Sequence, residues 1–249
     1  MRKLILILFI LLSCASLANS GGIISFPGGG VPSAAVSYDL EESFESSGDA
    51  YAEYDNVECG VAPCVTETAG DPTGDQLNSG LDAGIDMEDT YCLALDHTET
   101  FIFDAGTVAQ GTSMWVLGKF AHNDTLEDSE IIAAMGNNIY FFLYTDDKIK
   151  AFAPEGSGYT AAAVPVDADV WLKFEGQEGT GANARACVAY WTGAAWSDWT
   201  CKTNGTCTTE ITGFKVYNNQ DAEGEDMFWD NIKIKIGGED PFTADPSTY

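Results

Sequence analysis

Strict alternation near the carboxyl end of the chain constrains the fold more than any other feature. Ile232, Ile234 and Ile236 alternate with Lys233 and Lys235. A period of two is the pattern of a β-strand with one buried face. The segment therefore predicts a strand that belongs to a sheet packed on an apolar core.

Further strands are indicated along most of the chain. Runs rich in β-branched and aromatic residues are separated by loops rich in Gly, Asp, Asn and Thr, the largest of which is 66–89. No segment keeps a helical period over more than two turns. Many short strands with polar turns predict an antiparallel, all-β sandwich. The predicted strands are 39–46, 52–58, 90–96, 99–104, 113–120, 129–135, 138–144, 147–153, 169–175, 184–191, 196–201, 210–217 and 227–236.

One hairpin can be predicted in detail. A tight turn centred on Gly193 and Ala194 places Trp191 opposite Trp196 on one face of the sheet. Trp199 lies three residues beyond Trp196, so the alternation of side chains predicts that it points to the other face.

These segments resemble a known superfamily. The Phe44-Glu45 start, the hairpin YWTGAAW at 190–196 and the end FWDNIKIKI at 228–236 resemble the concanavalin A-like lectin/glucanase jelly rolls, including laminin-G-like modules. The resemblance covers residues 39–240, and it implies a jelly-roll sandwich followed by a C-terminal tail at 241–249. The smaller jelly-roll carbohydrate-binding modules share these ends and are the second fold prediction.

The amino-terminal residues 1–20 predict a signal peptide. Two basic residues precede the apolar run Leu4–Leu12, which is too short to span a bilayer. Cleavage after Ala18 or after Ser20 fits the small-residue rule, and lipidation at Cys14 is the alternative. We therefore expect a secreted protein, extracellular or at the cell surface.

The charge of the chain excludes some partners. It has 11 basic and 39 acidic residues, a net charge of −28. Nucleic acids and anionic membranes both need a basic face, so neither is expected as a partner. The acidic surface serves either solubility or the binding of divalent cations.

The cysteines predict disulfide bonds. Six of the seven lie beyond the predicted leader, and an even number in an exported chain indicates a disulfide framework. The spacing suggests Cys59–Cys64 and Cys201–Cys207 as local bridges, and Cys92–Cys187 as a bridge between distant strands. Zinc is the alternative, but no CxxC spacing supports it.

Residues 21–38 form an uncharged, Gly- and Pro-rich segment that predicts an extended N-terminal arm. One interpretation is a flexible linker. The other is strand donation, in which Ile23, Ile24 and Phe26 add to the sheet edge of a neighbouring molecule.

A glycosidase site is only partly present. Members of the resembled superfamily hydrolyse glycosides with paired carboxylates, and the laminarinase-like members carry Glu-x-Asp-x-(x)-Glu on one strand. The nearest match here runs from Gly84 through Asp86 to Glu88. Because Gly84 stands where the nucleophile belongs, we predict no catalytic residues and no enzyme activity.

The resemblance also implies a structural calcium ion. In such modules a calcium ion often joins the first and last strands, and Glu45 and Asp230 are the matching carboxylates. The alternative is that both side chains cap turns at the ends of the sandwich.

The tryptophans and two sequons are the remaining candidates. Trp191 and Trp196 form either a platform for sugar stacking or part of the core, where Trp115, Trp171 and Trp229 are also expected. The glycosylation sequons begin at Asn123 and Asn204.

These features describe a stand-alone exported sandwich with an adhesive arm. We therefore predict a structural subunit of an extracellular fibre or surface assembly, with other copies of the same chain as partners. A glycan-binding lectin is the first alternative and a glycoside hydrolase the second.

Overall fold

The computed structural model describes most of the chain beyond the arm. Side chains are not described at 64–69, 76–77, 156–163, 180–183 and 204–207. The signal peptide, the arm residues Ile23, Ile24 and Phe26, and the predicted strand 52–58 lie outside the described part. The described residues are 37–44, 64–69, 76–77, 81, 83–88, 91–95, 99–123, 130–136, 138–153, 156–165, 167–207, 210–218 and 226–249.

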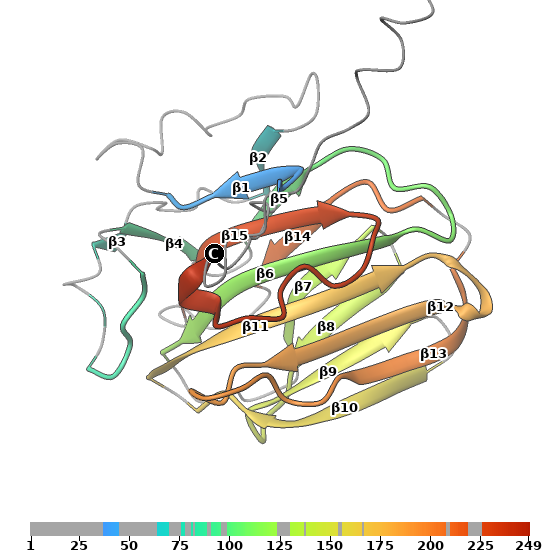
Figure 1. Cartoon of the computed structure of the whole chain (residues 1–249). Coiled ribbons are helices and arrows are strands. Elements are labelled where there is room, and N and C mark those ends of the chain that lie inside the picture. The colour runs from blue at the N-terminus through green and yellow to red at the C-terminus, as the bar shows by residue number, and fades with distance from the viewer. Residues whose placement is uncertain are drawn as a thin grey trace, which may run out of the picture. The chain divides into compact units, whose positions relative to one another are not determined.

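Within these residues the chain forms two antiparallel sheets that pack as a sandwich (Figure 1). Sheet A has eight strands in the order β13-β12-β11-β6-β15-β4-β3, with β1 paired to β15. Its strands are β1 (Leu40–Glu42), β3 (Gln76–Leu77), β4 (Tyr91–Leu95), β6 (Ser113–His122), β11 (Ala168–Gln177), β12 (Gly179–Tyr190), β13 (Thr200–Cys207) and β15 (Met227–Ile236).

Sheet B has seven strands in the order β10-β9-β8-β7-β14-β5-β2. Its strands are β2 (Cys64–Ala69), β5 (Thr100–Asp104), β7 (Glu130–Met135), β8 (Ile139–Leu143), β9 (Lys148–Ala153), β10 (Gly156–Ala163) and β14 (Phe214–Tyr217). A short 3-10 helix, η2 (Pro246–Thr248), follows near the C-terminus. The all-β antiparallel sandwich predicted from the sequence is confirmed. No helix in the described part is long and apolar enough to cross a membrane.

The alternation in β15 explains its two faces. Ile232 and Ile234 are fully buried in the core between the sheets, and Lys233 points to the other face of sheet A. A β-bulge between Asp230 and Lys233 adds one residue to β15 relative to β6. Because of this extra residue, Trp229 before the bulge also faces the core.

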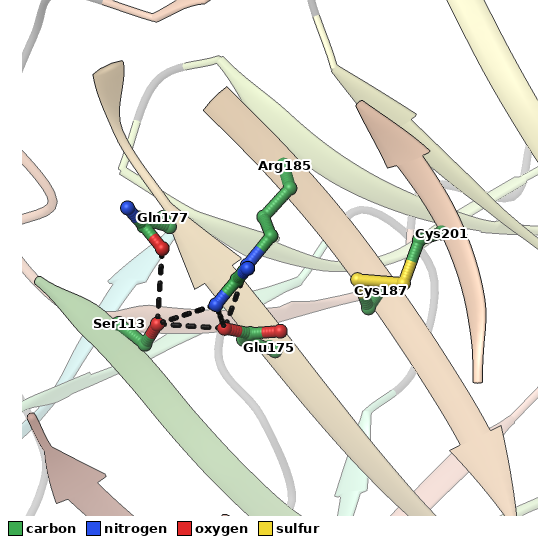
Figure 2. The surroundings of a disulfide bond; sticks show 6 residues. All are labelled: Ser113, Glu175, Gln177, Arg185, Cys187 and Cys201. Atoms are coloured by element: carbon green, nitrogen blue, oxygen red, sulfur yellow. Dashed lines mark hydrogen bonds and ion pairs between the residues drawn. A yellow bond between two sulfur atoms is a disulfide. The ribbon is translucent and has the colours of Figure 1, made fainter. Parts of the chain in front are cut away.

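The disulfide in the described part differs from the predictions. Cys187 on β12 and Cys201 on β13 lie directly opposite each other, with Cα atoms 4.1 Å apart, and are bonded (Figure 2). The predicted Cys92–Cys187 bridge is wrong because Cys92 lies on β4, and β11, β6 and β15 separate β4 from β12. Four strand spacings of about 4.8 Å are too far for a disulfide.

The predicted Cys201–Cys207 bridge is wrong for the same reason, since Cys201 is already bonded to Cys187. The predicted Cys59–Cys64 bridge lies outside the described side chains. The observed disulfide therefore joins two cysteines that face each other on adjacent strands. The spacing of the cysteines along the chain does not predict this pairing.

Removing this disulfide should destabilise the fold. The bridge closes a loop of 14 residues in sequence separation. Loss of the loop constraint in the Cys187→Ala/Cys201→Ala variant should lower the free energy of unfolding by about 3 kcal/mol. Denaturant titration measures this change, and reduced wild type should match the variant. A non-reduced peptide map that joins residue 92 to residue 187 would contradict the pairing.

Candidate functional site: a polar hollow on sheet A

The outer face of sheet A, which points away from the core, carries three nearly buried lysines. The side chains of Lys119, Lys173 and Lys233 are 8, 5 and 5 % exposed. A buried ammonium group is costly unless it is paired. Each one accordingly lies beside a carboxylate and near an aromatic ring. The three sets are Lys119 with Glu88 and Trp171, Lys173 with Asp240 and Trp196, and Lys233 with Glu41 and Tyr38.

The C-terminal tail packs on this face. The Lys173 ammonium donates to Asp240 Oδ2 at 2.6 Å and to the Phe242 carbonyl at 3.0 Å. Phe242 is fully buried and stacks on Tyr38 with ring centroids 5.8 Å apart. Trp196 Nε1 donates to the Ala244 carbonyl at 2.8 Å. Residues 240–249 are therefore part of the folded domain, although the sequence suggested a boundary at 240.

A hollow of about 180 Å³ lies between the tail and the sheet. The hollow is mainly polar, and its polar groups are a carboxylate, an amide, an ammonium, a hydroxyl and a phenol. Its lining residues are Glu88, Trp171, Asn231, Lys233, Pro246, Ser247 and Tyr249.

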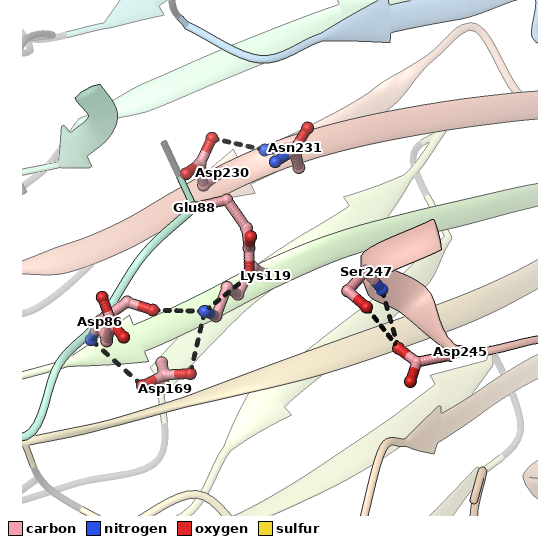
Figure 3. A network of polar contacts seen from close by, with 8 residues as sticks. All are labelled: Asp86, Glu88, Lys119, Asp169, Asp230, Asn231, Asp245 and Ser247. Carbon is pink, nitrogen blue, oxygen red and sulfur yellow. Dashed lines mark hydrogen bonds and ion pairs between the residues drawn. The ribbon is translucent and has the colours of Figure 1, made fainter. Parts of the chain in front are cut away.

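The β-bulge in β15 places Asn231 at this hollow (Figure 3). Asn231 has a backbone φ of 48°, in the left-handed region that residues other than glycine rarely adopt. Its N–H donates to Oδ1 of Asp230 at 2.7 Å, and Asp230 is fully buried. Bulges commonly redirect a side chain next to a functional site. Asn231 therefore takes an unusual backbone conformation where its amide meets the hollow.

Lys119 holds the loop that carries Glu88. Its ammonium lies 3.0 Å from Glu88 Oε1 and 3.2 Å from Asp169 Oδ2, and it also donates to the Asp86 carbonyl (Figure 3). Burial lowers the pKa of Lys119, but the hydrogen bond to Glu88 and the charge of Asp169 outweigh burial and raise it. Lys119 therefore stays protonated and positions Glu88.

Tyr249 keeps its phenol proton at neutral pH. Burial, the largest cause, raises the pKa of its phenol, although a hydrogen bond from the backbone N–H of Ala244 opposes the shift. That bond has a length of 2.6 Å and holds the ring against the tail. The phenol can therefore donate a proton to a ligand in the hollow.

The far end of this face is closed by internal contacts. Arg185 Nε donates to Glu175 Oε1 at 2.8 Å, and Ser113 Oγ donates to the same oxygen at 2.6 Å (Figure 2). Ser113 Oγ also lies 3.3 Å from Gln177 Oε1. These groups satisfy one another, so the hollow at Asn231 is the better candidate site.

The stability of the fold should decrease at alkaline pH. Burial and the neighbouring Tyr249 raise the pKa of Tyr38 from 10.0 to about 12. The unfolded chain then ionises Tyr38 above pH 10 while the folded chain keeps it neutral. Stability should thus be intact below pH 10 and fall as the pH rises towards 12. Melting temperatures across this window measure the loss, and Tyr38→Phe should show a smaller decline. An equal decline in that variant would rule out Tyr38 as a source.

The hairpin prediction is confirmed in part. Trp191 and Trp196 pair across the turn with ring centroids 5.5 Å apart, and both are half-buried on the outer face of sheet A. Trp199 does not point to the other face, because it packs against Trp115 on the same face, at 5.9 Å. Residues 197–199 are irregular, so the period of two does not apply there.

The predicted burial of the other tryptophans is confirmed. Trp229 lies in the core between the sheets, and Trp115 and Trp171 lie in a second buried cluster on the outer face of sheet A, where the tail covers them. Whether Trp191 and Trp196 bind glycan stays a prediction.

The incomplete glycosidase motif has a steric explanation. Gly84 has a φ of +113°, and a Cβ at this position would lie 2.3 Å from the Asp167 carbonyl oxygen. A glutamate cannot replace Gly84 in this backbone. Glu88, the last residue of the motif, does line the hollow.

The calcium prediction remains a prediction. Asp230 is fully buried beside the hollow, and β1 does pair with β15, as the prediction requires. Glu45 lies outside the described residues. The described part contains no group of three or more His, Cys, Asp or Glu side chains arranged to hold a metal ion.

Asn123, the first residue of one sequon, does not line the hollow. The side chain of Asn123 is bound to Asp226, accepting from its backbone N–H at 2.9 Å and donating to Oδ2 at 3.3 Å. Asn204 lies in β13, and its side chain is not described.

Six residues of the hollow were missed by sequence reasoning as site residues: Trp171, Asn231, Lys233, Pro246, Ser247 and Tyr249. Asn231 carried a usable signal, because an asparagine that interrupts a strict alternation suggests a bulge. Tyr249 carried none, because nothing in the sequence shows that the tail folds back on the sheet.

No protein-family model matches the chain, and no curated protein matches it. Solved structures share its fold. A carbohydrate esterase of the Shiga toxin-encoding bacteriophage phi24B has a TM-score of 0.53 at 8% identity, over 82% of this chain and 100% of the esterase. The PL-14 alginate lyase of Aplysia kurodai has a TM-score of 0.52 at 8% identity, over 80% of this chain and 99% of the lyase.

An endo-β-1,4-glucuronan lyase of Trichoderma reesei has a TM-score of 0.51 at 10% identity, over 84% of this chain and 100% of the lyase. At these identities the likeness shows a shared β-sandwich fold. It also corrects two predictions from the sequence, namely the structural fibre subunit and the absence of enzyme activity. These three solved structures are a carbohydrate esterase and two polysaccharide lyases.

Proposed function

We propose that the protein is a carbohydrate-active protein that binds a polysaccharide at the hollow on sheet A. The observation that carries this proposal is a polar hollow lined by an amide, an ammonium, a hydroxyl and a phenol, with Trp171 among its lining residues. The hydroxyls of a sugar ring need hydrogen-bond partners, and these groups supply them. The fold shared with an esterase and two polysaccharide lyases supports the same ligand class.

The hollow suits one sugar unit of a longer chain. Its volume of about 180 Å³ is below the roughly 300–1,000 Å³ of pockets that enclose drug-sized ligands. Neighbouring units would then extend over the outer face of sheet A, where the Trp191–Trp196 pair is half-buried.

The proposed reaction is β-elimination of a 4-linked uronate polysaccharide. Glu88 takes the proton from C5, the electron pair forms the C4=C5 double bond, and the C4–O4 bond breaks. Tyr249, which lines the hollow, protonates the leaving oxygen. Asn231 and Lys233 hold the uronate carboxylate, whose charge otherwise opposes removal of the C5 proton.

We further propose an extracellular location and a concanavalin A-like jelly-roll relationship. The Cys187–Cys201 disulfide supports an oxidising compartment, and the shared sandwich supports the relationship.

The reaction is tested with sodium alginate and with glucuronan as substrates. Elimination yields an unsaturated uronate that absorbs ultraviolet light, and we expect it to appear together with new reducing ends. Glu88→Gln and Tyr249→Phe should each lower turnover by about 100-fold or more. Gln110→Ala, at an exposed position between β5 and β6, serves as the control and should keep full turnover.

Each other outcome overturns a defined part of the proposal. Reducing ends without absorbance would indicate hydrolysis. Binding without cleavage of any tested polysaccharide would reduce the function to glycan recognition. No binding to alginate, glucuronan or a neutral β-glucan would overturn the proposal as a whole.

A further inference from the structure

A second aromatic surface lies on the outer face of sheet B, away from the hollow. On β8, Ile139, Phe141 and Leu143 enter the core, so Tyr140 and Phe142 point outward. On β9, Phe152 points outward for the same reason. All three outward rings are half-buried.

These three rings form one cluster. The ring centroids of Tyr140 and Phe142 are 6.3 Å apart, those of Tyr140 and Phe152 are 6.2 Å apart, and those of Phe142 and Phe152 are 6.1 Å apart. The solvent face of an antiparallel sheet normally carries polar residues. Three half-buried rings together on such a face form an apolar surface on which a ligand can pack.

Lysines lie on the same face as the rings. Lys150 Nζ donates to the Tyr144 hydroxyl at 2.6 Å and lies 4.4 Å from the centre of that ring. Lys215 lies in register between Ile102 of β5 and Ala134 of β7, and it has no ion pair within the described part of the chain. Its charge is therefore available to a ligand, whereas Lys119, Lys173 and Lys233 on sheet A are paired with carboxylates.

The combination of rings and lysines selects the kind of ligand. Lys150 and Lys215 place two positive charges on this face of a chain whose net charge is −28. A second copy of the chain is a poor occupant, because a two-fold interface brings the same lysines together. An acidic polysaccharide fits, since its carboxylates pair with the lysines and its C–H faces pack on the rings.

We propose that the outer face of sheet B is a second binding surface for an acidic polysaccharide, centred on Tyr140, Phe152 and Lys215. The ligand class rests on the proposed function, but the surface is separate from the hollow. It would hold a long chain while the hollow acts on one segment. Two sites on one polymer raise its apparent affinity by effective concentration, and a short oligosaccharide gains nothing from the second site.

The test compares binding of long-chain sodium alginate with binding of an alginate tetrasaccharide. In the Tyr140→Ala/Phe152→Ala variant we expect the affinity for the polymer to fall by about tenfold or more. Tetrasaccharide binding and turnover should stay unchanged. Lys215→Glu changes one half-buried surface residue and should weaken polymer binding in the same direction, with a steeper loss at low salt. Melting temperatures check that both variants are folded.

The outcomes separate this inference from the proposed function. If both sheet B variants bind the polymer like wild type while Tyr249→Phe loses turnover, the proposal of a second binding surface is wrong. The proposed function is then still supported. If the sheet B variants lose polymer binding and wild type shows no turnover, the proposal of a second binding surface is supported. The proposed reaction is then wrong. A change from dimer to monomer with unchanged polymer binding would make this face a self-association surface and overturn the inference.

Discussion

Replacing Trp229 by alanine is expected to lower the free energy of unfolding by about 3–5 kcal/mol, which is a large fraction of the total for a single domain. Trp229 is fully buried at the centre of the core. Its ring centroid lies 4.8 Å from that of Phe120, 6.0 Å from that of Phe214 and 6.2 Å from that of Phe174. The variant therefore loses contacts to both sheets and leaves a cavity between them.

Trp229→Phe is the matched control and should lower the free energy of unfolding by less than about 1.5 kcal/mol. The indole N–H of Trp229 is buried and has no hydrogen-bond partner among the residues that the structure describes. An unsatisfied buried donor costs about 1–3 kcal/mol, so removing it offsets part of the lost packing. Denaturant titration of both variants gives the two values. If Trp229→Phe lowers the free energy of unfolding as much as Trp229→Ala does, the indole N–H has a favourable partner and this explanation is wrong.

Replacing Phe242 by alanine is expected to lower stability by about 3 kcal/mol and also to abolish ligand binding at the hollow. Phe242 is fully buried on sheet A, with Tyr249 edge-on to its ring at 5.5 Å. Without this anchor the tail loses its position, and Ser247 and Tyr249 leave the hollow wall. The affinity for alginate oligosaccharides should then fall by about tenfold or more.

Two variants check that the effect comes from the anchor. Ala244→Ser changes an exposed residue of the same tail and should keep both stability and binding. Phe242→Leu keeps most of the buried surface and should fall between the alanine variant and wild type. Full binding in Phe242→Ala at a temperature where it is folded would show that the tail does not form the site.

Strands with a clear alternation could be predicted from the sequence, and strands at sheet edges were harder to predict. The predicted 227–236 matches β15, and 147–153 and 138–144 match β9 and β8 within a residue at each end. By contrast, β2, β3 and β10 were missed. The sequence GSGYTAAA of β10 is rich in Gly and Ala, which have low strand propensity, so its pairing with β9 supplies the structure.

The sequence by itself determined the all-β class, the antiparallel pairing and the hairpin at Trp191–Trp196, because these follow from local alternation and turn chemistry. Only the tertiary structure decided which cysteines meet, which face each lysine occupies and where the tail lies. Cys187 meets Cys201 because β12 and β13 are neighbours, and Lys233 is buried because Glu41 of β1 and the ring of Tyr38 lie next to it. The hollow joins residues from a loop, two strands and the tail. Contacts between segments far apart in the chain depend on the packing of the whole domain, and local sequence does not contain them.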